Sequence, residues 1–280
     1  MFLGRHTCLP YLFDDDHLKA VPGLAALGRL PPTILLVGDR RRVARVLDFL
    51  EDGVDVAEAA AQAVGPRAAG RVAVGFGHRR GVPVLVVETQ MGGPATEIIT
   101  REVIDPAFHP TPPHAVIRVG SCGVLEDLDP PPELVVGAFA AGWSSANEQA
   151  RAGVFAAFGG EEVPEHLCTP AVIEALEDGV AKAPADLPAG TGGVLSKDSL
   201  YAEAGGDIAE AMRGLGCLAT EMELATIGPI AEAAGAGWGG IMASVGWIPK
   251  GNWFDRERAA RNEDAAIDAA IEAACLLGEG

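Results

Sequence analysis

Apolar residues along the chain fall into short runs that alternate with stretches of helical spacing. The run at 33–39, TILLVGD, ends in Gly-Asp, and the apolar residues after it recur at helical intervals: Val43, Val46, Leu47 and Leu50. A short continuous run is typical of a buried strand, and the wider spacing is typical of one face of a helix. The pattern therefore predicts a strand, a tight turn and a helix.

The same alternation continues along the rest of the chain. Further strands are predicted at 71–77, 82–88, 114–119, 133–142, 191–195 and 239–245, the first two joined as a hairpin by HRRG. Helices are predicted at 95–104 after Pro94, at 170–182, at 206–214, at 219–235 with a kink at Pro229, and from Asp255 onward. Strands that alternate with helices predict an α/β fold, a single three-layer α/β/α domain over 1–280 with a mixed, largely parallel central sheet.

The net charge and the lengths of the apolar runs argue against some classes of binding partner. The formal net charge of −18 argues against nucleic acid and anionic membranes as partners, because both are bound by basic surfaces. No uninterrupted apolar run reaches the roughly 18 residues of a membrane span. The start of the chain is interrupted by Arg5, His6 and Pro10, which is atypical of a signal peptide. We expect a cytoplasmic protein whose anion sites are local gatherings of arginine.

Cysteine and histidine spacing gives no sign of a metal centre. The cysteines stand at 8, 122, 168, 217 and 275, an odd and scattered set without a CxxC pair. This favours reduced thiols over a disulfide framework or a zinc site. The histidines likewise lack HExxH or another ligand spacing. We therefore expect neither a metal nor an organic cofactor.

Three glycine-bearing segments follow predicted strands and are read as loops: 37–42 (VGDRRR), 89–94 (TQMGGP) and 118–123 (RVGSCG). In open α/β sheets, ligands bind beyond the carboxyl ends of the strands, where loops lead into helices. The hypothesis is that the three segments share one site.

Arginines are the candidate anion ligands of that site. Gly38 would let backbone N–H groups approach an anion at a helix N-terminus, with Arg42 one turn further on. The alternative for Arg42 is a solvated helix face. Arg118 interrupts an apolar strand, so it either forms a salt bridge to a structural carboxylate or binds an anion together with Ser121. Cys122 is interpreted as a packing residue, because no general base stands near it in the sequence.

Two carboxylates, Glu221 and Glu223, form the third candidate element. Residues at i and i+2 point to different faces of a helix, so these two converge only if the segment is a strand-to-helix turn. The alternative is that both are favourable acidic residues of a first helical turn. A carboxylate held at a turn could accept hydrogen bonds from two vicinal hydroxyls, as in a ribose.

Taken in order, these motifs resemble the purine nucleoside and uridine phosphorylase superfamily from about Thr33 to the last helix. TQMGGP and EMELATI are similar to the uridine branch, which the chain resembles more, and RVGSCG is similar to the purine branch. The resemblance implies phosphate ligands at Gly38, Arg42, Arg118 and Ser121, with a further arginine, Arg71 or Arg67, from a neighbouring subunit. It also implies ribose contacts at Met91, Glu221, Met222 and Glu223, and His6 or His17 from a partner's N-terminal segment.

The base-binding half departs from both branches. The resemblance assigns Leu200 and Gly123 to the base. The glutamine and arginine that read uracil correspond to Ala204 and Gly206, and the aspartate that protonates a purine corresponds to Gly246. The proline that often follows Gly-Asp is Arg40. Other side chains that could read an unusual base are Lys197, Asp198, Trp247, Asn252 and Trp253.

The resemblance implies phosphate-dependent cleavage of a nucleoside to a free base and ribose or deoxyribose 1-phosphate, with inorganic phosphate as co-substrate. Arg118, Arg42 and Glu223 are the expected catalytic residues. A homo-oligomer, from dimer to hexamer, is expected because partner subunits complete the site, with residues 1–32 as an extension that contacts a neighbour. The alternatives are a nucleosidase that uses water and a catalytically idle nucleoside-binding protein.

Overall fold

The computed structural model describes residues 20–64, 72–104, 111–143, 166–198 and 207–278. Within these ranges the strands are β1 Thr33–Val37, β2 Val54–Asp55, β3 Val74–Arg79, β4 Val82–Glu88, β5 Ala115–Val124, β6 Leu134–Trp143, β7 Ala189–Lys197, β8 Cys217–Glu221, β9 Gly237–Trp247 and β10 Asn252–Trp253. The helices are α2 Pro22–Leu27, α3 Arg40–Asp48, α4 Val56–Val64, α5 Gly93–Ile104, α7 Pro170–Val180, α8 Asp207–Gly214, α9 Leu224–Ala234, the 3-10 turn η3 Ile248–Lys250, and α10 Arg256–Gly278.

The described strands form one mixed sheet in the order β10-β9-β6-β7-β8-β5-β1-β4-β3-β2, and β9 also pairs with β5. The extra pairing closes β5, β9, β6, β7 and β8 into a ring, while β1, β4, β3 and β2 extend from β5 as an open sheet. The pairings of β1 are parallel, whereas β3–β4, β5–β8 and β6–β9 are antiparallel. The predicted mixed α/β fold is confirmed; the ring closure was not predicted.

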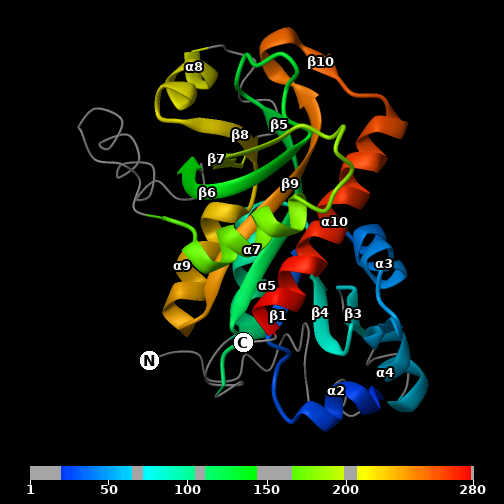
Figure 1. Ribbon diagram of the computed structural model, residues 1–280. Helices are drawn as coiled ribbons and strands as arrows, with labels where there is room; N and C mark the ends of the chain where they lie inside the picture. Colours follow the sequence, from blue (N-terminus) through cyan, green and yellow to red (C-terminus); the bar gives the residue numbers. More distant parts are fainter. Residues whose placement is uncertain (1–19, 65–71, 105–110, 144–165, 199–206, 279–280) are drawn as a thin grey trace.

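Helices cover both faces of the sheet. One apolar cluster packs α3, α7 and α10 against one face, with Val46, Leu176 and Ile271 among its fully buried side chains. A second cluster packs α5 and α9 against the other face. Figure 1 shows α10 crossing the molecule between α7 and α3. Strands β1 and β4 are thus buried on both sides, which explains their continuous apolar runs.

Strand β5 has two different neighbours along one edge. Residues Ala115 to Val119 pair with β1, and Gly123 and Val124 pair with β8. The opposite edge pairs with β9 along the whole strand, with an irregularity between Cys122 and Gly123. The change of neighbour from β1 to β8 therefore falls just beyond Arg118, at the carboxyl end of β1.

Two expectations about local structure were wrong. Residues 118–123 are not a loop, because β5 continues through them to Val124 and their backbone groups pair with β9. Residues 219–221 are not helical but end strand β8, and α9 begins only at Leu224. In both places neighbouring strands supply backbone partners, which a short helical or glycine-rich sequence pattern does not reveal.

The other elements follow the predicted order. The strand, turn and helix at 33–48, the hairpin of β3 and β4, and the long C-terminal helix are confirmed. Pro94 lies at the second position of α5, where its missing N–H costs no helical hydrogen bond. None of the described helices is long and apolar enough to cross a membrane.

Close contact between α7 and α10 depends on Gly179. A Cβ atom at this position would lie 2.3 Å from the backbone oxygen of Ala269, so the helices would have to separate. We expect Gly179→Ala to lower the free energy of unfolding by about 1–3 kcal/mol through overpacking. Gly214→Ala is the matched control, because no atom of the described residues lies within 4 Å of its Cβ position at the end of α8. Urea denaturation of both variants checks this; equal midpoints would contradict it.

Candidate functional site

Arg42 and Arg118, the two arginines of the predicted anion site, converge beside Gly38, directly after β1. A Cβ atom placed on Gly38 would lie 3.5 Å from Nη1 of Arg42, and 3.6 Å and 3.7 Å from Nη2 and Nη1 of Arg118. Glycine therefore leaves a space between two guanidinium groups that a side chain would fill. A strand end, a helix start and a neighbouring strand meet at this point.

Arg42 is held by the start of α3 and by α10. Asp39 caps the helix, its carboxylate accepting hydrogen bonds from the backbone N–H groups of Arg41 at 2.9 Å and of Arg42 at 3.2 Å. The Arg42 side chain is buried, and its Nε donates to the Glu263 carboxylate on α10. The side chain of Arg41, in contrast, is 92% exposed. The interpretation of Arg42 as part of a solvated helix face is therefore wrong.

The charge of Arg118 is paired inside the protein, but its hydrogen bonding is incomplete. Its side chain is 4% exposed, Nη2 donates to Oε2 of Glu223, and Nε lies 3.7 Å from Oε2 of Glu221. Neither Nε nor Nη1 makes a hydrogen bond within the described residues. A buried donor without an acceptor is costly, and a guanidinium binds anions through paired N–H groups. Nη1, which lies beside Gly38, is thus suited to an external anion.

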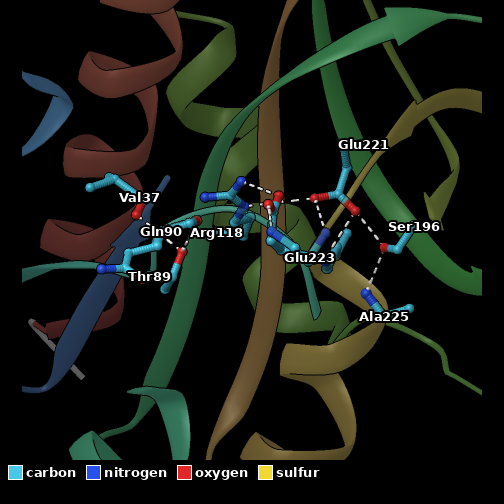
Figure 2. Close-up of polar contacts among 10 residues, drawn as sticks. Val37, Thr89, Gln90, Arg118, Ser196, Glu221, Glu223 and Ala225 are labelled. Carbon is cyan, nitrogen blue, oxygen red and sulfur yellow. Dashed lines mark hydrogen bonds and ion pairs between the residues drawn. The ribbon is translucent and has the colours of Figure 1, made fainter. Parts of the chain in front are cut away.

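Glu221 and Glu223 stand at a strand-to-helix turn, as the convergent interpretation requires (Figure 2). Glu221 accepts hydrogen bonds from the backbone N–H groups of Glu223 at 2.8 Å and Leu224 at 2.9 Å, and from the Ser196 hydroxyl. Ser196 in turn accepts from the backbone N–H of Ala225 at 2.8 Å. Glu221 therefore fixes the turn, and the turn aims Glu223 at Arg118.

Burial sets the proton affinity of this carboxylate pair. Burial raises the pKa of Glu221 above its usual range, and the nearby charge of Glu223 raises it further. Arg118 and the hydrogen bond from Ser196 act in the opposite direction. Glu221 and Glu223 thus share the guanidinium group of Arg118 in a site with little access to water.

The segment after β4 completes this side of the site. Thr89 donates from its backbone N–H at 2.7 Å and from its hydroxyl at 3.1 Å to the carbonyl oxygen of Val37. The backbone N–H of Gly92 donates to Oε1 of Glu223 at 2.7 Å. Gly92 has φ of 87°, a left-handed conformation that glycine adopts without strain. Met91 next to it is 70% exposed. The three predicted segments therefore share one site.

Residues on the side of β8 that faces away from Glu221 form a second small group. A Cβ atom on Gly123 would lie 2.8 Å from Ile248 and 3.7 Å from Thr220, and the Thr220 hydroxyl has no hydrogen-bond partner in the described part of the chain. A Cβ atom on Gly246 would lie 2.8 Å from the Trp253 ring, so a carboxylate side chain there would require the ring to shift. Lys197, at the end of β7, is buried, and burial lowers its pKa to about 8.

Other predicted residues are less closely tied to the site. Ser121 is half-buried on β5, and Met222 is half-buried between the two glutamates. Trp247 donates to the carbonyl oxygen of Glu126 at 2.9 Å, Asp198 is half-buried, and Asn252 is exposed on β10. The following residues lie outside the described ranges, and their roles stay predictions: His6, His17, Arg67, Arg71, Leu200, Ala204 and Gly206.

Sequence reasoning missed two residues that support the site. Glu263 binds Arg42 from α10, more than two hundred positions away, and no local motif marks it. Ser196 connects β7 to the Glu221 turn and to the first turn of α9. No local motif marks Ser196 either, because the pairing of β7 with β8 brings it to Glu221.

Burial also determines the reactivity of the thiols. Burial raises the pKa of Cys122, Cys168 and Cys217 to about 12 in each case. Because the thiolate is the nucleophile, these thiols stay protonated and unreactive at pH 8. We expect iodoacetamide at pH 8 to leave all three unmodified in the native protein and to modify them after denaturation, as peptide mass spectrometry would show. Rapid native labelling of Cys122 would contradict its interpretation as a packing residue.

Known proteins resemble this chain over most of its length. Purine nucleoside phosphorylase DeoD-type 2 of Vibrio parahaemolyticus is 30% identical over 262 residues, which cover 92% of this chain and 97% of that protein. The protein of the same name from Vibrio cholerae is 29% identical over 261 residues, with the same coverage.

Solved structures share the fold. A uridine phosphorylase from Vibrio fischeri ES114 has a TM-score of 0.69 at 20% identity, covering 89% of this chain and 94% of that one. A purine nucleoside phosphorylase from Toxoplasma gondii in complex with immucillin-H has a TM-score of 0.67 at 19% identity, covering 90% and 93%. The model of the family described as the Phosphorylase superfamily matches residues 32–276, and the chain therefore belongs to that superfamily.

Proposed function

We propose that this protein is a nucleoside phosphorylase, a pentosyltransferase that cleaves an N-glycosidic bond with inorganic phosphate. One observation carries the proposal: among the described residues, Nη1 of buried Arg118 has no hydrogen-bond acceptor at the point beside Gly38 that Arg42 also reaches. Two convergent guanidinium groups in a site with little water are suited to a phosphate dianion. Family membership and the purine and uridine phosphorylase names of the relatives agree with this chemistry.

The proposed reaction needs positioning and charge more than covalent catalysis. The bond between C1′ and the base nitrogen breaks, and its electron pair leaves with the base. A phosphate oxygen bonds to C1′, and the proton of the hydrogen phosphate dianion passes to the departing base. The products are a neutral base and the ribose 1-phosphate dianion. Arg42 and Arg118 hold the phosphate against the cationic sugar, which stabilises the transition state electrostatically. No organic cofactor or metal takes part.

Glu223 is proposed to orient the ribose. Its Oε2 accepts from Arg118 and its Oε1 accepts from the backbone N–H of Gly92 at 2.7 Å. A carboxylate has about four lone-pair positions, so it can also accept from two sugar hydroxyls. Phosphate and ribose would then be held by groups that touch one another, which fixes the line of attack. Met91 and Met222 would pack against the sugar.

Partner subunits are proposed to complete this site in a cytoplasmic homo-oligomer. The proposal rests on the family resemblance, in which an arginine (Arg71 or Arg67) and a histidine (His6 or His17) cross from a neighbour. Ser121 would add a donor to the phosphate. The names of the relatives do not identify the base of the substrate, because they include purine and uridine phosphorylases.

Phosphate dependence tests the proposed function. The protein is incubated with purine and pyrimidine nucleosides in phosphate and in a non-coordinating buffer, and free base and sugar phosphate are measured by chromatography. We expect base release that requires phosphate and yields one sugar 1-phosphate per base. Release of free ribose without phosphate would instead identify a nucleosidase. Nucleoside binding in calorimetry without base release would identify a binding protein.

The role of Arg42 has a matched control on the same helix. Arg42 and Arg45 both bind carboxylates of α10, Glu263 and Asp264, but only Arg42 reaches the space beside Gly38. We expect Arg42→Ala to lower kcat/KM for phosphate about 100-fold or more, because it removes a group that stabilises transition-state charge. Arg45→Ala should stay within about threefold of the parent, since exposed ion pairs contribute little. Steady-state kinetics with varied phosphate measure both, and equal effects would refute the role of Arg42.

A further inference from the structure

We infer that Lys197 and Thr220 recognise the base and that they select nucleosides whose base presents a carbonyl oxygen rather than an amino group. This inference rests on the proposed function, because it assigns the leaving group of that same site. It concerns the half of the site in which the sequence departs from both branches of the superfamily.

The position of the base follows from the direction of attack. Phosphate must approach C1′ from the side opposite the departing base, so the two lie on opposite sides of the ribose. Figure 2 shows Val37 and Thr89 on one side of the Arg118–Glu223 pair and Ser196 on the other, beyond Glu221. With phosphate beside Gly38 and ribose at Glu223, the base lies toward the carboxyl ends of β7 and β8.

Alternation along β7 places Lys197 away from the carboxylates. Side chains of a strand point alternately to its two faces, and Ser196 is fixed toward Glu221 by its hydrogen bonds. Lys197 therefore shares the face of Leu195, which packs in an apolar cluster with Leu125 and with Ile248 at its edge. The Lys197 side chain is buried there, at the carboxyl end of its strand. Lysine is rarely buried to this extent, so its ammonium group is a candidate for contact with a ligand at the strand end.

Thr220 provides the independent observation. It lies opposite Leu195 in the pairing of β7 with β8 and opposite Gly123 in the pairing of β5 with β8, so it belongs to the same face. It is 4% exposed, and its hydroxyl has no hydrogen-bond partner among the described residues. A buried hydroxyl without a partner is a rare and costly feature unless a ligand satisfies it. Thr220 and Lys197 are thus polar groups on one otherwise apolar face.

The chemistry of an ammonium group selects the edge of the base. Burial lowers the pKa of Lys197 to about 8, so most molecules carry the charge at pH 7. An ammonium has three N–H donors and no acceptor, so it keeps capacity for a carbonyl oxygen beside the contact that Lys197 already has within the chain. The electron pair of the broken bond spreads onto such oxygens in a departing oxo base. An amino group in that place would present a second donor to the ammonium.

The test compares bases that differ in one exocyclic group. The proteins are the parent, Lys197→Met and Thr220→Val, and the substrates are inosine against adenosine and uridine against cytidine, all with phosphate. The parent should favour the oxo member of whichever pair it accepts. Lys197→Met should lower kcat/KM for oxo nucleosides about 100-fold, as expected for loss of a group that stabilises transition-state charge, and change amino nucleosides less than threefold. Lys250→Met is the control, since its side chain is 49% exposed and pairs with Asp127.

Thr220→Val separates recognition from folding. Valine keeps the shape of threonine and removes a hydroxyl that has no partner among the described residues, so the thermal midpoint should not fall. Its kcat/KM for oxo nucleosides should nevertheless fall, by about tenfold. An unchanged value would overturn the role of Thr220, and this variant decides the inference if Lys197→Met does not fold.

Failure of the inference and failure of the proposed function give different results. A parent enzyme that cleaves amino nucleosides faster with phosphate overturns the inference and leaves the phosphorylase function intact. Equal losses for both members of a pair in Lys197→Met also overturn it. Absence of any phosphate-dependent cleavage overturns the proposed function; calorimetry of hypoxanthine against adenine with the parent and Lys197→Met then decides base selection. Equal affinities would refute it.

Discussion

A guanidinium buried among apolar strands must be neutralised, and the way in which Arg118 is neutralised organises the site. Its charge is shared by Glu223 and Glu221, which reach it from the turn between β8 and α9. Replacing such an arrangement with apolar residues would often cost nothing in stability. Stability alone therefore does not account for a partly satisfied guanidinium between two carboxylates, which supports the proposal that an anion and a sugar bind there.

Strand β5 makes this arrangement possible because it joins the open part of the sheet to the ring. Its first half continues the parallel open sheet beside β1, and its second half belongs to the closed ring beside β8. The carboxyl end of β1 and the β8 turn therefore meet at the same stretch of β5. Ligands of α/β proteins bind where strand neighbours diverge, since loops there leave a crevice. In the proposed function, Gly38 and Arg42 of the phosphate site follow β1 of the open sheet, whereas Glu223 of the ribose site follows β8 of the ring.

The sequence predicted the elements whose pattern is local and missed those that depend on distant neighbours. The strand, turn and helix around Gly38 carry their own apolar spacing and cap, so they were predicted correctly. The extension of β5 through RVGSCG was missed because its glycines are typical of a loop, while β9 supplies the backbone partners that keep it a strand. Likewise residues 219–221 form a strand instead of a helix because β5 and β7 pair with them. The convergence of Arg42, Arg118 and Glu223 was predicted, whereas Glu263 and Ser196 could not be, since only tertiary structure brings them there.

The charges of the proposed site explain why a cationic side chain from a neighbouring subunit would help it to bind phosphate. The two guanidinium groups, on Arg42 and Arg118, already face the carboxylates of Glu263 and Glu223, so their charges are offset before phosphate arrives. A dianion added to this site leaves excess negative charge in a poorly solvated space, which is costly. The raised pKa of Glu221 reduces the excess, because a protonated Glu221 contributes no charge. An arginine from a neighbouring subunit would remove most of the rest. In the proposed homo-oligomer such an arginine would act locally, beside the phosphate, whereas the net charge of −18 of each chain repels anions at longer range.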